Sequence, residues 1–346
     1  MTDIMKAALH DLIDGDMPGS ETITQCFNDI MNGDVSQVQM SAFLVALKMR
    51  GERVEDIAAA ASVMRAKATT INAPDGTMDI VGTGGDGIGT YNISTATAFV
   101  VAGCGIPVAK HGNKAISSKS GAADVLSCLN IKLDCDLALV SRALEDAGVC
   151  FLMAPRHHSA MRHVGPVRAD LGVRTIFNLL GPLANPALVK RIMVGVFDRG
   201  WCLPFAEALA KLGTTHAWVV HGSDGLDEVT TTGETHVVSL ADGVIREFTI
   251  SPSDIGLSTV SIDDLRGGTP EENAAHLQAL LDGSVGAYRD IVIFNAAAAL
   301  VAGGHAPSLV DAAAMARDSL DSGKAKTEMA KLVKITNRGA YYDRYS

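Results

Sequence analysis

The chain has 346 residues and a mass of 36.1 kDa, which is enough for two domains, and 47% of its residues are apolar, which excludes an intrinsically disordered protein. A formal net charge of −10 and a pI near 5.4 argue against a general nucleic-acid or membrane-surface role, because phosphate groups repel an acidic protein. The six cysteines form no CxxC pair, the N-terminus has no apolar signal core, and no apolar run reaches the ~20 residues of a membrane span. We therefore expect a cytoplasmic protein that neither binds nucleic acid nor crosses a membrane.

Residues 1–70 predict a small all-helical domain. Apolar side chains recur at helical spacing in four stretches that Gly33, Gly51 and other turn residues separate: 5–12, 23–31, 40–47 and 54–64. Four short helices bury little apolar surface on their own. That surface should meet either a second domain or another subunit, and the pattern leaves both open.

Residues 71–164 and 187–346 predict a large α/β domain. Expected strands are 78–81, 107–109, 149–152, 217–221, 235–240 and 244–250, and expected helices are 94–103, 121–129, 136–147, 202–212, 270–281, 287–302 and a region beyond 308. The sequence Ala-Asp-Gly at 241–243 predicts a hairpin, so the central sheet should be mixed. Residues 165–186 contain Gly-Pro and Asn-Pro, break the alternation, and predict a crossing between the domains.

The stretch after the first expected strand indicates a phosphate site. Glycines occupy positions 82, 84, 85, 87 and 89, and Asn92 to Thr95 can cap a helix from 96 to 102. The free N–H groups at such a helix start attract anions. The same letters contain GxGxxG, but a dinucleotide site needs an acidic residue roughly 20 positions further on, where this chain has Lys110 and His111. Asp86 also argues against a simple pyrophosphate cradle.

Two further stretches carry charge. Residues 110–124 hold three lysines and three serines with no acid before Asp124; a solvated basic loop is the ordinary interpretation, but the position after a buried strand favours a loop that wraps an anion. Asp227 and Glu228 follow a glycine-containing turn. An adjacent acidic pair is commonly solvated, yet opposite an anion-binding loop it favours Mg²⁺, which takes few protein oxygens plus substrate phosphates.

The motifs together resemble those of the anthranilate phosphoribosyltransferase family, in that family's order and over almost the whole chain. They are GTGGD (82–86), NIST (92–95), KHGNKAISSKSGAAD (110–124), GVRTIFNLLGPLANP (172–186) and DGLDEV (224–229). The resemblance implies a fold of the nucleoside phosphorylase/phosphoribosyltransferase type and a homodimer formed through the helical domain. It also implies that residues 165–186 return to the small domain, and that the active site is the cleft between domains.

The resemblance also implies the reaction and its residues. Anthranilate would attack C1 of 5-phosphoribosyl pyrophosphate in tryptophan biosynthesis, with two Mg²⁺ ions per monomer. No general base is assigned, because the arylamine is neutral with a free lone pair. Ser94 and Glu228 would hold one ion, and Asp227 and Glu228 the other. Gly82, Asn113 and Arg168 would contact anthranilate. Phosphoribosyl pyrophosphate would be held by Gly82, Gly85, Asp86, Thr90, Asn92, Ile93, Ser94, Thr95, Lys110, His111, Gly112, Asn113, Lys114, Ala115, Ile116, Ser117, Ser118 and, through its backbone only, Ala122.

Several histidines and two other protein classes bear on this interpretation. His111 and His158 are expected to line the pocket and His157 to lie on the surface.

Pyrimidine nucleoside phosphorylases share the architecture, but they carry a second Gly pair after a Lys-His-Ser phosphate loop, whereas this chain has HGN and an Asp-Glu pair. A catalytically silent, nucleic-acid-binding relative would be expected to lose GTGGD or DGLDEV and gain basic surface, and this chain shows neither change.

Overall fold

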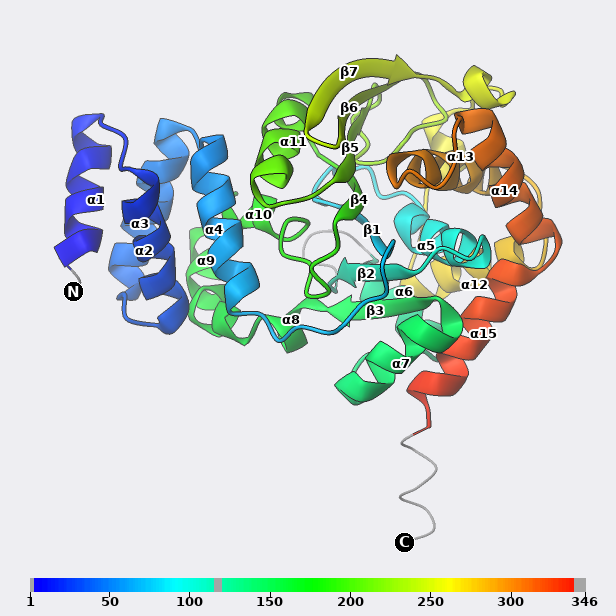
Figure 1. The fold of residues 1–346 in the computed structure, drawn as a ribbon, viewed down its shortest axis with the longest axis horizontal. Helices are drawn as coiled ribbons and strands as arrows, with labels where there is room; N and C mark the ends of the chain where they lie inside the picture. Colours follow the sequence, from blue (N-terminus) through cyan, green and yellow to red (C-terminus); the bar gives the residue numbers. More distant parts are fainter. Residues whose placement is uncertain (1–2, 115–119, 339–346) are drawn as a thin grey trace, which may run out of the picture.

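The computed structural model describes residues 3–114 and 120–338, with a cluster of helices at one end and a sheet-centred part at the other (Figure 1). The cluster, here called the helical module, consists of α1 (Asp3–Asp14), α2 (Ser20–Asn32), α3 (Gln37–Arg50) and α4 (Val54–Ala66). The helix ends follow the local sequence: Ser36 Oγ accepts from Gln39 N–H at the start of α3, and Gly33 closes α2 in the left-handed conformation with φ 84°.

Residues 165–186 add helices to this module. They form α9 (Gly165–Leu171), which packs against α3, and α10 (Phe177–Leu180), which packs against α4. The ring of Phe27 meets the rings of Phe43 and Phe177 edge to face, each at a centroid distance of 5.8 Å. The core of the helical module is thus completed by a side chain from the distant crossing segment.

The sheet has seven strands in the order β3-β2-β1-β4-β5-β6-β7. Their bounds are β1 (Met78–Gly82), β2 (Val108–Gly112), β3 (Val149–Met153), β4 (Arg191–Gly195), β5 (His216–Gly222), β6 (Thr235–Ala241) and β7 (Val244–Ile250). The first five are parallel, whereas β6 and β7 pair antiparallel. Asp242 (φ 47°) and Gly243 (φ 83°) make the hairpin turn. The prediction of a helical domain joined to an α/β domain with a mixed sheet is confirmed.

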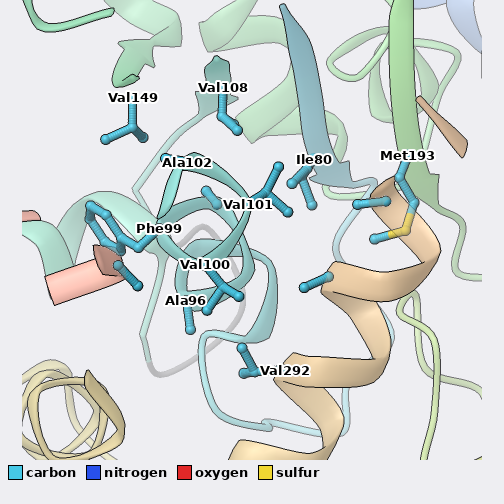
Figure 2. Packing of buried hydrophobic residues seen from close by; sticks show 14 of the residues in the cluster. Ile80, Ala96, Phe99, Val100, Val101, Ala102, Val108, Val149, Met193 and Val292 are labelled. Atoms are coloured by element: carbon cyan, nitrogen blue, oxygen red, sulfur yellow. The ribbon is translucent and has the colours of Figure 1, made fainter. Parts of the chain in front are cut away.

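Helices cover both faces of the sheet, because strand side chains alternate between them. On one face Ile80 and Met193 pack against α5 (Ile93–Gly103) and α13 (Ala287–Ala302), with Phe99 and Val292 prominent in Figure 2. The same face carries α6 (Ala122–Cys128), α7 (Leu137–Ala147), α12 (Pro270–Leu281), α14 (Leu309–Asp321) and α15 (Lys324–Thr336) in one apolar cluster. The short helix α8 (Ala154–His157) follows β3.

The opposite face belongs to the same apolar core as the helical module. Val81, Ile192 and Val194 point to this side and pack with α11 (Cys202–Lys211), which in turn contacts α4. Part of the apolar surface that the four short helices could not bury alone is therefore covered by the large domain. Contact with another subunit stays a prediction.

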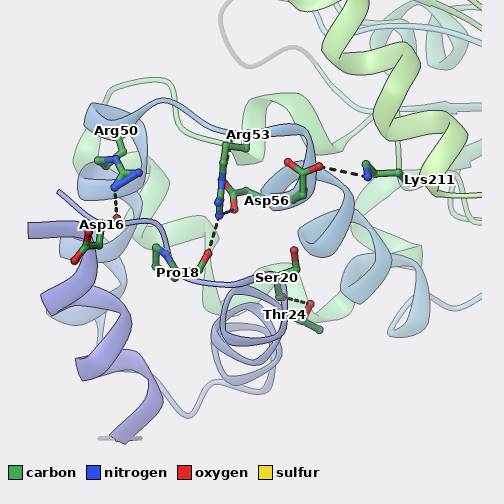
Figure 3. Close-up of polar contacts among 9 residues, drawn as sticks. Asp16, Pro18, Ser20, Thr24, Arg50, Arg53, Asp56 and Lys211 are labelled. Atoms are coloured by element: carbon green, nitrogen blue, oxygen red, sulfur yellow. Dashed lines mark hydrogen bonds and ion pairs between the residues drawn. The ribbon is translucent and has the colours of Figure 1, made fainter. Parts of the chain in front are cut away.

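Polar contacts hold the edges of the helical module (Figure 3). The guanidinium of Arg53 pairs with the fully buried carboxylate of Asp56 at 2.7 Å and donates to the carbonyl of Pro18 at 2.7 Å. Lys211 on α11 forms an ion pair of 3.3 Å with Glu55 on α4. Because both side chains of this second pair are exposed, it contributes roughly 0 to 1 kcal/mol, and apolar packing dominates the contact between the two parts.

Three local predictions were wrong. The strand β4 was not predicted, although it lies between β1 and β5; its apolar run is only Ile192 to Val194 and follows directly on the crossing segment. Strand β2 extends to Gly112 and does not end at residue 109. Helix α5 begins at Ile93, one residue before the expected helix 94–103, so a start at 96 with Ser94 in the cap was wrong. Among the described residues, no helix is both long and apolar enough to span a bilayer.

Replacing Phe27 by alanine should destabilise the protein by about 3 to 5 kcal/mol, because the ring fills the junction of α2, α3 and α10. Urea denaturation measures this free energy of unfolding. The control is Val285→Ala at a side chain that is 87% exposed, which should change stability by less than about 0.5 kcal/mol. Equal effects of the two substitutions would show that the junction is not a packed core.

Candidate active site

The strand order reverses between β1 and β4, and several predicted site residues gather where these strands end. In open α/β sheets, ligands bind at the carboxyl ends of the strands at such a reversal. The loop after β1 is joined there to the end of β4: Thr83 N–H donates to the carbonyl of Gly195 at 2.9 Å, and Thr83 Oγ1 accepts from Phe197 N–H at 3.1 Å.

Glycines let the segment after β5 lie directly on these strand ends. A Cβ on Gly82 would lie 2.4 Å from Asp227 Oδ2, and one on Gly195 would lie 1.6 Å from the carbonyl oxygen of Asp227. No real Cβ tolerates such contacts. In the loop itself, Gly84 (φ 68°) and Gly85 (φ 83°) take conformations that other residues rarely adopt. Gly82 and Gly195 are thus required by the close approach of the acidic segment, whereas Gly84 and Gly85 are required by their backbone conformation.

The acidic pair is hydrogen-bonded to the glycine loop and to the helix that follows it. Asp227 Oδ2 accepts from Gly84 N–H at 2.6 Å, and Glu228 Oε1 accepts from Ser94 N–H at 3.1 Å. Ser94 is in the first turn of α5, where backbone N–H groups lack partners within the helix. The three residues predicted to hold metal, Ser94, Asp227 and Glu228, are therefore neighbours, although Ser94 is far from the other two in sequence.

Burial makes negative charge costly at this pair. It raises the pKa of Asp227 to about 6, with Asp86 adding repulsion, and raises the pKa of Glu228 to about 8, with Asp227 adding repulsion. The pKa of Asp86 is also raised, mainly by burial. Among residues 3–114 and 120–338, no three His, Cys, Asp or Glu side chains converge closely enough to hold a metal ion by themselves. A cation there would need oxygen ligands from elsewhere.

Lys110 supplies positive charge under the pair. Its side chain is 4% exposed, and its ammonium donates to the carbonyl of Ile80 at 2.6 Å and to Ser94 Oγ at 3.1 Å. Burial lowers the pKa of Lys110, and the charges of Asp79, Glu228 and Asp227 oppose that shift. The expectation that this lysine begins a loop of unpaired donors was wrong, because Lys110 lies within β2 and already has two acceptors.

A buried polar cluster below the site ties the crossing segment to the sheet. The carboxylate of Asp79 on β1 accepts from His111 N–H at 3.1 Å and from Asn185 Nδ2 at 2.7 Å. Asn185 also donates to the carbonyl of Ala109 at 2.8 Å. Burial raises the pKa of Asp79 to about 6. The Asn-Pro pair at 185–186 is thus fixed between β1 and β2.

The remaining residues predicted to bind phosphoribosyl pyrophosphate lie in two groups. Thr90 and Asn92 end the glycine loop, whereas Ile93 and Thr95 have buried side chains and can offer only backbone groups outward. Gly112 ends β2 and Asn113 follows it, with Asn113 Oδ1 accepting from Lys114 N–H at 2.8 Å. Ala122 is the first residue of α6. Ala115, Ile116, Ser117 and Ser118 lie outside the described residues.

Two arginines of the crossing region differ in their surroundings. Arg168 on α9 is half-buried and forms no ion pair with a carboxylate that the structure describes, and burial lowers its pKa. Arg174, to which no role was assigned from its motif, donates to the carbonyl of Gly85 and lies over the ring of Phe197 at 4.2 Å. Only the three-dimensional contact reveals that Arg174 supports the glycine loop.

The histidines are more buried than expected. His111 Nδ1 lies 3.0 Å from the carbonyl of Gly181, and its ring centroid lies 5.2 Å from that of His158. Burial lowers the pKa of His111 to about 3 and that of His158 to about 4, so both rings are neutral at pH 7. The expectation that His157 lies on the surface was wrong: it is 1% exposed, and its Nδ1 lies 2.6 Å from the carbonyl of Thr69.

A buried asparagine anchors the chain just after the acidic pair. Asn295 interrupts the apolar sequence of α13 and is fully buried. Its Oδ1 accepts from Val229 N–H at 3.0 Å, and its Nδ2 donates to the carbonyl of Val229 at 2.7 Å. This two-point contact fixes the backbone next to Glu228. The polar residue within an alanine-rich helix is the sequence signal that could have found this contact.

Comparisons with known proteins agree with this geometry. Residues 6–68 match the family model described as glycosyl transferase family, helical bundle domain, and residues 74–326 match glycosyl transferase family, a/b domain. The chain is 54% identical over 337 residues to an anthranilate phosphoribosyltransferase from Parvibaculum lavamentivorans, covering 97% of this chain and 98% of the relative. It is 57% identical over 312 residues to the enzyme of that name from Rhodospirillum rubrum, covering 90% of each. The chain belongs to the anthranilate phosphoribosyltransferase family.

Solved structures of anthranilate phosphoribosyltransferases have the same fold. The crystal structure from Thermus thermophilus superimposes with a TM-score of 0.90 at 43% identity, covering 95% of this chain and 99% of that one. The structure from Saccharomyces cerevisiae in complex with phosphoribosyl pyrophosphate and Mg superimposes with a TM-score of 0.88 at 28% identity, covering 97% and 99%. A second yeast structure, at 26% identity and a TM-score of 0.86, contains 4-fluoroanthranilate and covers 96% and 98%. Membership of this family disfavours the dinucleotide and nucleoside phosphorylase interpretations.

The substitution Gly195→Ala should push the 223–229 segment off the end of β4, because the new methyl group would overlap the carbonyl of Asp227. Overpacking of this kind costs about 1 to 3 kcal/mol. Urea denaturation should show that loss, and amide hydrogen exchange should accelerate in residues 223–229. Gly19→Ala is the control, since a Cβ at Gly19 meets nothing within 4 Å. Unchanged exchange in the acidic segment of the Gly195 variant would refute the close approach.

Proposed function

We propose that this protein transfers the 5-phosphoribosyl group from phosphoribosyl pyrophosphate to the amine of anthranilate, releasing pyrophosphate in a step of tryptophan biosynthesis. The observation that carries the proposal is the meeting of three features where the strand order reverses. They are the glycine loop, the buried ammonium of Lys110 and the Asp227-Glu228 pair. Sequence identities above 50% with enzymes of this name support it.

The acidic pair fits Mg²⁺. Asp227 and Glu228 are buried carboxylates with raised pKa values, so negative charge there lacks full compensation, which a divalent cation would provide. The two carboxylates do not complete a metal shell, and Mg²⁺ ordinarily completes its shell with water and substrate phosphates. We assign two ions per monomer: Ser94 and Glu228 would hold the first, and Asp227 and Glu228 the second. Bound there, Mg²⁺ would supply positive charge against the pyrophosphate leaving group.

The chain's own groups would bind and orient the donor substrate. The N–H groups of Gly84 and Ser94 donate to the acidic pair. Other backbone N–H groups of the glycine loop and of the first turn of α5 are suited to phosphate oxygens. The amine of Lys110 lies 3.1 Å from Ser94 Oγ, where its protonated form would stabilise the negative charge of the leaving group. The arylamine of anthranilate would attack C1 with its neutral lone pair as the bond from C1 to pyrophosphate breaks, and the amine proton would then pass to water or to the released pyrophosphate. No strong general base is therefore required.

Anthranilate would lie between Gly82, Asn113 and Arg168. Its carboxylate needs a cation, and the guanidinium of Arg168 is paired with no described carboxylate. Lys110 is already engaged with two acceptors, which leaves Arg168 better suited to a carboxylate. The neutral rings of His111 and His158 present no competing positive charge to this substrate.

We further propose a cytoplasmic homodimer formed through the helical module. Exposed apolar side chains on α1 and α3 support this, with Ile13 72%, Val38 80% and Met49 84% exposed.

We place the domain boundaries near residues 70, 164 and 187. The packing of α9 and α10 into the helical module supports this division.

The decisive experiment on function mixes the purified protein with anthranilate, phosphoribosyl pyrophosphate and Mg²⁺ and follows anthranilate fluorescence. We expect a loss of fluorescence that requires all components and releases pyrophosphate stoichiometrically. Stable fluorescence with a folded protein would overturn the proposed function.

The double substitution Asp227→Asn and Glu228→Gln should abolish turnover, because amides carry no charge to hold Mg²⁺. The melting temperature should stay nearly unchanged, because the amides match the carboxyl groups in size and their oxygens can still accept from Gly84 N–H and Ser94 N–H. Wild-type protein in excess EDTA should be equally inactive. Full activity in either case would contradict the metal assignment.

The substitution Arg168→Ala should weaken the apparent affinity for anthranilate by about 10- to 150-fold, which corresponds to a charge-assisted hydrogen bond of roughly 1.5 to 3 kcal/mol. The apparent affinity for phosphoribosyl pyrophosphate should change far less. Steady-state kinetics with each substrate varied, together with a melting curve, tests this. Parallel changes for both substrates, or a collapse in stability, would instead make Arg168 a structural residue of α9.

A further inference from the structure

Asn273 on α12 is a buried amide whose orientation is fixed by the backbone. The residue is 2% exposed, and its Oδ1 accepts from Gly268 N–H at 2.8 Å. A backbone N–H can only donate, so the acceptor end of the Asn273 amide must face Gly268. Its Nδ2 group therefore has to face the other way.

That Nδ2 group fixes a second amide. It donates to Asn92 Oδ1 at 2.9 Å, and Ser120 Oγ lies 3.4 Å from the same oxygen. Two donors thus hold the acceptor end of Asn92. The Nδ2 of Asn92 makes no hydrogen bond with any residue in the described ranges and is not sealed from solvent. It is the end left for a ligand.

The segment around Asn273 also holds the end of the glycine loop. Gly267 N–H donates to the carbonyl of Gly89 at 3.0 Å, and Tyr91 N–H donates to the carbonyl of Leu265 at 3.1 Å. A Cβ on Gly267 would lie 2.5 Å from the carbonyl oxygen of Thr90. The hydrogen bonds that run from Gly268 through Asn273 to Asn92, here called the relay, therefore lie within a tightly packed contact.

We propose that Asn273 is a positioning residue that makes Asn92 present a hydrogen-bond donor, and not an acceptor, to phosphoribosyl pyrophosphate. The proposal rests on the proposed function. Phosphate oxygens only accept hydrogen bonds, so the Nδ2 group of Asn92 attracts this substrate whereas its Oδ1 would repel it. Asn273 need not touch the substrate to decide which end is offered.

The substitution Asn273→Asp tests the relay. In its ionised form the new carboxylate still accepts from Gly268 N–H but cannot donate to Asn92, and the Asn92 amide should turn to donate to it. Because burial raises the pKa of a carboxyl group, the kinetics are measured at increasing pH, and the effect should grow as the group ionises. A melting curve accompanies the kinetics, because a carboxylate at this buried position lowers stability. In protein that is still folded, KM for phosphoribosyl pyrophosphate should rise about 10- to 100-fold, through loss of a hydrogen bond to a charged group and repulsion by the exposed oxygen. KM for anthranilate should not change.

A double variant separates the effect of the Asn92 amide orientation on KM from the effect of the added negative charge. With Asn92→Ala present, the further change Asn273→Asp should leave KM for phosphoribosyl pyrophosphate unaltered, because there is no amide to turn. Gln278→Glu is the matched control: it adds the same charge on α12 without contacting Asn92, and should leave both KM values unchanged.

Each outcome has one meaning. A rise in KM confined to the background with Asn92 supports the relay. An equal rise in both backgrounds, or no rise in either, overturns it while wild-type turnover still supports the proposed function. Absence of wild-type turnover overturns the proposed function itself. In that case, titration calorimetry with phosphoribosyl pyrophosphate still measures the relay, since the same pattern is expected in Kd.

Discussion

The structure depends on the close packing of the buried acidic segment, residues 223–229, against the ends of the central strands β1 and β4. Asp227 approaches β1 and β4 so closely that only glycine fits at positions 82 and 195. Its carboxyl group and that of Glu228 take hydrogen bonds from the glycine loop and the start of α5, but these do not offset the cost of burying negative charge at the pair, and both pKa values are raised. The ammonium of Lys110 supplies part of the balance. A divalent cation, held together with substrate phosphates, would supply the rest. The same buried acidic pair that packs against the strands would therefore also bind the metal and, through it, the substrate.

The supports of this segment come from distant parts of the chain. Asn295 holds the backbone of Val229 from α13, and the crossing segment reaches β1 and β2 through Asn185. The same crossing segment sends Phe177 into the core of the helical module. The crossing segment therefore contacts both the core of the helical module and the strands that lead to the site.

The sequence was sufficient for most elements and insufficient for their contacts. Helices with regular apolar spacing and the Asp242-Gly243 hairpin were predicted because their signals are local. Strand β4 was missed because a three-residue apolar run beside prolines has no period of its own. Lys110 was assigned to a loop because its buried partners, the carbonyl of Ile80 and the hydroxyl of Ser94, are invisible in a linear pattern. The roles of Arg174 and Asn295 rest entirely on tertiary contacts, and the site residues named by resemblance stay predictions until a ligand is observed.

The most direct test is a crystal structure of the protein with phosphoribosyl pyrophosphate and Mn²⁺, whose anomalous signal locates the metal in place of Mg²⁺. We predict metal peaks at about 2.0 to 2.3 Å from carboxylate oxygens of Asp227 and Glu228, with pyrophosphate oxygens completing the shell beside the glycine loop. Metal peaks away from both carboxylates, or pyrophosphate bound away from the ends of β1 and β4, would contradict this assignment.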